Sequence, residues 1–143
     1  MCIVNDDNAV VKNGRLKLWK VVCRDNKIGL WWGTGWHNIT GIGKMYLLGV
    51  NIAKSFISRG KFLKQITHPG QFHCFFTRKE ARRYMEHRYS VCSMFFKVKS
   101  KRTKIIRVCA DSSDVIKVGR DESSDIRAIS VSKMEIKSLK HQR

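Results

Sequence analysis

Acidic residues are scarce in this sequence, with 11 Asp and Glu against 29 Lys and Arg. The formal net charge of +18 makes a compact chain repel itself and attracts polyanions such as nucleic acids. The largest group of acids lies between residues 111 and 125, and we interpret it as a solvated loop. No pair of carboxylates is placed by the sequence for acid–base catalysis. The composition therefore favours an anion-binding protein over an enzyme.

Paired cysteines are also missing. The five cysteines are odd in number and no two have C-x-x-C spacing, so we expect reduced, structural side chains. A zinc site would have to use the neighbours His73 and Cys74, which point to opposite faces of a strand. A cysteine nucleophile would need a base, and no local pattern pairs one with Cys74, Cys92 or Cys109. We expect no metal and no cofactor.

Long apolar runs are absent as well. None approaches the roughly 20 residues that span a bilayer, and the N-terminus lacks a basic leader followed by an apolar block. The sequence predicts an intracellular protein without a membrane partner.

The clearest local pattern is a strand that runs into a helix, over residues 71–89. The aromatic run from Phe72 to Phe76 suits a strand. Thr77 and Glu80 then have capping-box spacing, and Ala81, Tyr84 and Met85 recur at helical spacing. We predict a helix from about Thr77 with these three side chains directed inward.

The rest of the chain predicts an α+β fold with mostly antiparallel sheet and one or two short helices packed on it. We expect an N-terminal arm (1–14), one domain (15–137) and a basic tail (138–143). A hairpin is predicted over 15–33, with Leu16 and Leu18 on one face and Lys17 and Trp19 on the other. The other predicted elements are a strand at 44–50, a helix at 51–60, and strands at 94–101, 104–109, 114–118 and 126–136.

Residues 33–43 are rich in glycine but fit no phosphate-binding template. A Walker loop would need glycine at Asn38 and Ser or Thr at Met45. We interpret this stretch as a loop. Trp31 and Trp36 are candidates for stacking on bases, although tryptophans of this kind also serve as core residues.

Two groups of cations are the candidate anion-binding residues. In a strand over 94–101, alternation would place Lys97, Lys99 and Lys101 on one face. Lys and Arg contacts to phosphate supply most of the sequence-independent affinity for nucleic acid. The full candidate set is Arg78, Arg82, Arg83, Lys97, Lys99, Lys101, Arg102, Lys104 and Arg107.

The 71–84 pattern resembles "G-F-H-x-F … T/S-x-x-E-A-x-x-Y", found in small uncharacterised proteins of bacteriophages and large DNA viruses. Gln71 stands where that pattern has glycine. The runs 18–22, 125–128 and 132–136 are similar to other segments of the same proteins, so the likeness covers about 16–137. It implies a compact α+β domain and a viral origin, with a location in the host cytoplasm or nucleus. It implies no activity.

Three functions remain open at the sequence level. The first is a non-enzymatic accessory protein that binds nucleic acid through the Lys/Arg stripe. The second is a protein that counters host defence by binding a host protein or by sequestering an anionic nucleotide signal, which requires a pocket. The third is an enzyme whose site the sequence does not reveal. The oligomeric state is not predicted.

Overall fold

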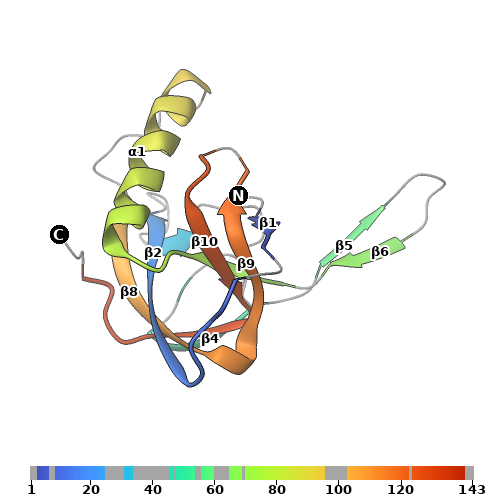
Figure 1. The fold of residues 1–143 in the computed structure, drawn as a ribbon. Coiled ribbons are helices and arrows are strands. Elements are labelled where there is room, and N and C mark those ends of the chain that lie inside the picture. The colour runs from blue at the N-terminus through green and yellow to red at the C-terminus, as the bar shows by residue number, and fades with distance from the viewer. Residues whose placement is uncertain are drawn as a thin grey trace.

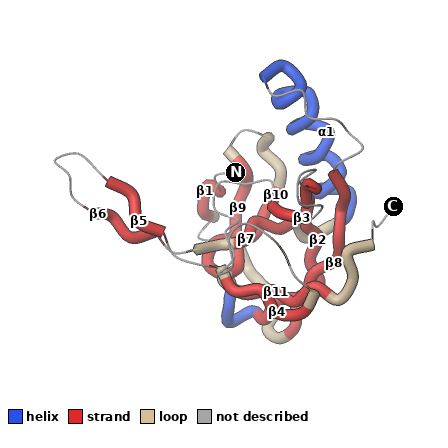
Figure 2. Tube along the Cα trace, turned by 180° about the vertical axis from the view of Figure 1, so that it is seen from behind, coloured by secondary structure: helices blue, strands red, loops and turns tan. Residues whose placement is uncertain are grey.

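Two antiparallel sheets and one long helix form most of the described structure (Figure 1). The computed structural model describes residues 3–6, 9–24, 31–33, 46, 48–53, 56–59, 65–68, 70–95, 103–122 and 124–140. The sheets curl around a shared interior, and a hairpin of β5 (Phe56–Arg59) and β6 (Gln65–His68) projects away from them (Figure 2). Mostly antiparallel sheet with a helix against it is the predicted architecture.

The five-stranded sheet is built around the long pairing of β2 (Arg15–Arg24) with β8 (Thr103–Asp111). Their register runs from Arg15 opposite Asp111 to Cys23 opposite Thr103. On its other side β2 pairs with β3 (Trp31–Gly33), which confirms the predicted hairpin. The sheet continues from β8 to β11 (Lys133–Ile136) and ends at β4 (Gly49–Ile52).

The four-stranded sheet has the order β1 (Ile3–Asn5), β9 (Val115–Asp121), β10 (Arg127–Val131) and β7 (Phe72–Cys74). Strand β1 lies in the segment that we expected as an N-terminal arm. It pairs with β9, with Ile3 opposite Asp121, and the Ile3 side chain is buried. This part of the segment is therefore packed into the sheet.

The two sheets are connected by the chain itself and by backbone hydrogen bonds between their edges. Trp19 and Phe75 exchange backbone hydrogen bonds of 2.9 and 2.8 Å, which link β2 to β7. The single strand predicted over 126–136 is wrong, because β10 and β11 belong to different sheets and are separated at Ser132. The Ser132 N–H donates to Asp114 O at 2.9 Å, beside β9, and its carbonyl accepts from the Ala53 N–H at 2.8 Å, beside β4, so the chain passes from one sheet to the other at this residue.

Alternation along the strands produces two cores. One face of β2 directs Leu18 and Val22 into the interior that the two sheets share, where they join side chains such as Ile106, Ile129 and Met134. The other face directs Val21 beneath the helix, into a second apolar cluster. Both faces of β2 are thus buried along part of its length.

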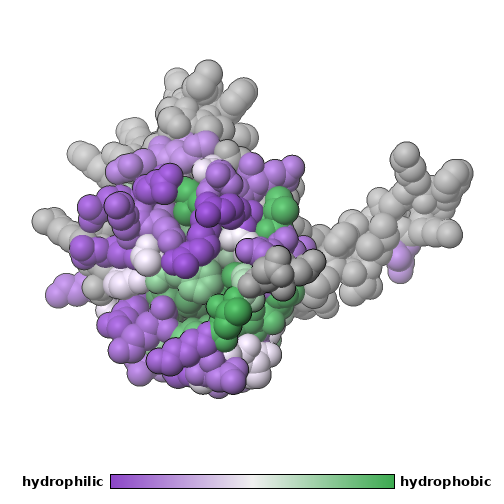
Figure 3. All heavy atoms as spheres, viewed as in Figure 1, coloured by the Kyte–Doolittle hydropathy of each residue, from purple (hydrophilic) through white to green (hydrophobic). Residues whose placement is uncertain are grey.

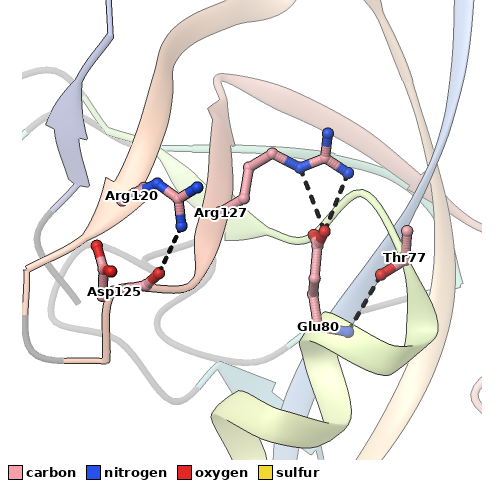
Figure 4. Close-up of polar contacts among 5 residues, drawn as sticks. All are labelled: Thr77, Glu80, Arg120, Asp125 and Arg127. Atoms are coloured by element: carbon pink, nitrogen blue, oxygen red, sulfur yellow. Dashed lines mark hydrogen bonds and ion pairs between the residues drawn. The ribbon is translucent and has the colours of Figure 1, made fainter.

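The helix α1 (Arg78–Phe95) begins where the sequence predicts it. Thr77 Oγ1 accepts from the Glu80 N–H at 3.1 Å, which caps the first turn. Ala81 and Tyr84 are buried and Met85 packs at the margin of the same cluster, as predicted. The Glu80 carboxylate does not follow the capping-box expectation: its Oε1 accepts from Arg127 Nε and Nη2, at 3.2 and 2.9 Å (Figure 4).

Two further predicted elements are wrong. Residues 51–60 were predicted as a helix, but the described part forms β4 and β5, because pairing with β11 and with β6 overrides a weak helical spacing. The strand predicted from Met94 is wrong at its start, because α1 continues through Phe95. Residues 96–102, which include Lys97, Lys99, Lys101 and Arg102, lie outside the described residues.

Candidate nucleic-acid interface

The outer face of the five-stranded sheet carries a group of cations around one tryptophan. Strand alternation places Arg15, Lys17 and Trp19 on the same face of β2. The register places Lys17 opposite Cys109 and Trp19 opposite Arg107 on β8, and Cys109 opposite Glu135 on β11. We call the exposed cations of this surface the outer basic face; they are Arg15, Lys17, Arg107, Lys133 and Lys137.

The carboxylates of this face are engaged within the protein. Glu135 forms ion pairs with Arg15 at 2.8 Å and with Lys137 at 3.9 Å. Asp111 Oδ1 accepts from the Ser113 N–H and hydroxyl, and these bonds hold the pKa of Asp111 below its usual value. The nearby charges of Arg15 and Lys133 contribute to the same shift, by less.

Three cations of the outer basic face, Lys17, Arg107 and Lys133, are accessible to a bound anion. Within the described part of the chain, no carboxylate forms an ion pair with Lys17, Arg107 or Lys133. All three side chains are exposed. Alternate residues of a strand lie about 7 Å apart and neighbouring strands about 5 Å apart. The cations are therefore spread over several strands of the sheet, in two dimensions. Such an arrangement can contact several phosphates at once.

Trp19 gives this surface an aromatic component. Its ring packs at the margin of the cluster beneath α1 and is half-buried. The Arg107 Cζ lies 5.9 Å from the ring centroid, within cation–π range. Stacking against a base would need the part of the ring that remains accessible.

The helix presents a second group of exposed cations: Arg78, Lys79, Arg82 and Arg83. Arg78 and Arg82 are four residues apart, as are Lys79 and Arg83, and like charges at that spacing destabilise a helix. Arg78 and Lys79 also lie in the first turn, where the helix dipole favours acids. Glu86, four residues after Arg82, offsets only part of this repulsion, so an external anion is a physical reason for these charges.

Arg120 and Arg127 are cross-strand partners, but they are used inside the fold. Arg127 binds Glu80 and lies over the Phe76 ring, with its Cζ 4.5 Å from the centroid. Arg120 Nη1 donates to the Asp125 carbonyl at 2.9 Å (Figure 4). This group ties the first turn of α1 to the four-stranded sheet. We do not include it in the interface.

The other candidates from the sequence fall in different places. Arg107 belongs to the outer basic face, and Arg78, Arg82 and Arg83 to the helix. Lys104 is half-buried and its Nζ donates to the Leu139 carbonyl, so it holds the C-terminal segment. Trp31 lies on β3, whose backbone alone is described. Trp36 and four of the basic candidates lie outside the described residues, the latter being Lys97, Lys99, Lys101 and Arg102.

Sequence reasoning missed the residues of β2 and β11 in this surface. The alternation of Arg15, Lys17 and Trp19 is visible in the sequence, but their proximity to Lys133 is not. Asp121, which we interpreted as part of a solvated loop, is instead buried at the end of β9. Its Oδ2 accepts from the Ser124 N–H at 3.0 Å and from the Ser124 hydroxyl at 2.5 Å.

Lys20 is buried in the shared interior, between Leu18 and Val22 on the inward face of β2. Its Nζ donates to the His73 carbonyl at 2.7 Å and lies 5.5 Å from the centroid of the Tyr46 ring. Burial lowers the pKa of Lys20 to about 8, and the neighbouring Cys74 partly offsets the effect.

Cys74 and Tyr46 share this interior with Lys20. Burial raises the pKa of the Cys74 thiol to about 11, against the opposing effect of Lys20. Burial likewise raises the pKa of Tyr46 well above its ordinary value. Since thiolate is the reactive form, these surroundings disfavour Cys74 as a nucleophile.

One face of the molecule combines hydrophilic and apolar residues. Figure 3 shows that hydrophilic residues cover most of one face, around a smaller apolar area in its lower middle part. Among the described residues, no cluster of His, Cys, Asp or Glu could hold a metal ion, and no helix is long and apolar enough to cross a membrane.

Comparisons with protein-family models, with curated proteins and with solved structures found no match to this chain.

Proposed function

We propose that this protein binds nucleic acid through the outer basic face and acts by binding, not by catalysis. The observation that carries the proposal is the register of β2, β8 and β11, which gathers cations from three distant segments around Trp19. The five cations of that surface outnumber its described carboxylates, Glu135 and Asp111, so the surface keeps a net positive charge.

The net charge of +18 supports the same proposal. Repulsion among so many cations opposes folding, and a bound polyanion relieves it. The helix cations add to this argument, because their spacing and position oppose the stability of α1. A polyanion that contacts both groups would neutralise more charge than either group could alone.

The expected binding depends on phosphate more than on base sequence. Lys and Arg side chains on an exposed sheet contact the backbone, and phosphate contacts carry no sequence information directly. A flat, open surface also suits an extended chain better than a free nucleotide, which needs a pocket to bury it. We therefore expect binding to single and double strands with little sequence preference.

The test removes three cations of the outer basic face, in the variant Lys17→Gln/Arg107→Gln/Lys133→Gln. Fluorescence anisotropy with labelled oligonucleotides at low salt should show affinity reduced by roughly tenfold or more. The matched control, Lys12→Gln/Lys117→Gln/Lys140→Gln, removes the same charge at exposed positions outside this face and should lose much less. Equal losses in the two variants would show that net charge, and not this surface, determines binding. Tight binding of a free nucleotide with no binding of oligonucleotides would contradict the proposal.

A further inference from the structure

Strand β4 forms one edge of the five-stranded sheet. Among the described residues its strand partner is β11 alone. The sequence of β4 is Gly-Val-Asn-Ile. Proteins commonly protect such edges with lysine, proline or a bulge, and β4 has none of these.

The backbone of β4 presents two residues to the open side. The Ala53 N–H donates to Ser132 O at 2.8 Å, so Ala53 and Ser132 form a hydrogen-bonded pair at the end of the ladder. Antiparallel pairs alternate, so Asn51 also bonds toward β11, opposite Met134. The N–H and C=O groups of Val50 and Ile52 therefore point away from β11.

The side chains of the same residues form an exposed apolar strip. Val50 is 59% exposed and Ile52 is 62% exposed, and Leu48, just before the strand, is 64% exposed. An added strand would bury these side chains while it satisfied the backbone groups. The edge thus offers both components of strand addition in one place.

The charge around the strip selects the partner. Lys133 lies opposite Ile52 on β11 and Glu135 lies opposite Val50. Glu135 is paired with Arg15 and Lys137, so cations outnumber the carboxylate beside the strip. A second copy of this chain would bring another +18 to the contact, which opposes self-association. We propose that β4 binds an extended acidic segment of another protein, with alternating apolar residues, as an added strand. This interaction uses backbone hydrogen bonds, so it does not depend on the proposed binding of nucleic acid.

The test uses a short fluorescein-labelled peptide of alternating Glu and Val. Wild-type protein should bind it, and affinity should fall by about tenfold or more for a peptide N-methylated at alternate residues, which cannot pair with an edge. Replacing Glu by Lys should reduce affinity to a similar extent. Because these comparisons use the wild-type protein, they do not depend on whether a variant folds.

Protein variants locate the site. Ile52→Glu should weaken binding of the Glu–Val peptide by about tenfold or more, because it removes an apolar contact and places a carboxylate beside an acidic peptide. Val10→Glu is the matched control, since Val10 is 94% exposed outside any strand, and it should bind the peptide nearly as wild type does. Hydrogen exchange at the amides of Val50 and Ile52 should slow when the peptide binds.

Three results would overturn the proposal. One is equal binding of the parent and N-methylated peptides, which would show attraction by charge alone. Another is no binding of the Glu–Val peptide by the wild type. The third is a wild-type dimer, seen by analytical ultracentrifugation, that Ile52→Glu dissociates, which would make a second copy the occupant of the edge.

Discussion

Lys20 illustrates how one residue can depart from the pattern of its strand. In Leu18, Lys20 and Val22 the sequence alternates toward the interior, and an apolar side chain would be expected at the middle position. Burying an ammonium group is unfavourable unless it is hydrogen-bonded, and the His73 carbonyl supplies one acceptor. The sequence gives no sign of this, because His73 lies on another strand.

The buried lysine predicts a specific dependence of stability on pH. The folded-state pKa of about 8 lies below the unfolded value of 10.5, so between these values the unfolded chain holds a proton that the native chain has lost. The unfavourable contribution of Lys20 is thus largest below about pH 8 and decreases as the pH rises. From pH 8 to pH 9 the free energy of unfolding should rise by about 1 kcal/mol in wild type relative to Lys20→Met.

Urea denaturation of both proteins across this range is the measurement. The window is chosen because Cys74 acts in the opposite direction at higher pH, where its raised pKa makes stability fall. Taking the difference between wild type and Lys20→Met cancels the other titrating groups to first order. A difference that stays constant with pH would show that Lys20 has an ordinary pKa.

The cap of α1 is a second property of a single residue. Thr77→Ala should lower the free energy of unfolding by about 1 kcal/mol, because the Glu80 N–H loses its acceptor. Thr77→Ser keeps the hydroxyl and should lose much less. If the alanine and serine variants have the same denaturation midpoint, the hydroxyl does not stabilise the helix.

At the scale of elements, the sequence predicted those helices and strands that depend on residues close together in the chain. The start of α1 follows from Thr77 and its helical spacing, and the hairpin over 15–33 follows from alternation in β2. The helix predicted over 51–60 failed because β4 and β5 are fixed by partners elsewhere in the chain. The break between β10 and β11 at Ser132 was missed for the same reason, since its backbone partners are Asp114 and Ala53, which lie beside different sheets.

Removing the helix cations should raise the stability of the protein and lower its affinity for nucleic acid. The variant Arg78→Gln/Arg82→Gln/Arg83→Gln removes one cation from the first turn, Arg78, and the like-charge pairs four residues apart. Its free energy of unfolding should therefore rise by roughly 0.5 kcal/mol. Affinity for an oligonucleotide should fall. The paired measurements are urea denaturation and anisotropy, and unchanged affinity would remove the helix from the interface.

At the scale of the molecule, the sequence favours a kind of ligand but does not locate a surface for it. A net charge of +18 indicates a polyanion wherever the charges lie. The outer basic face could not be predicted, because it needs the register that brings Arg15, Arg107 and Lys133 into one sheet. The viral origin implied by the resemblance stays a prediction.

The salt dependence of oligonucleotide binding tests the central claim most directly. Each phosphate contact releases counterions and contributes a slope of about −0.7 on single strands and −0.9 on duplexes to log K against log salt concentration. Wild type should show a slope of about −3 or steeper. The slope of Lys17→Gln/Arg107→Gln/Lys133→Gln should be shallower by about 2, because up to three phosphate contacts are lost. No salt-sensitive binding at low ionic strength, or the same slope in both proteins, would contradict the assignment of nucleic acid to the outer basic face.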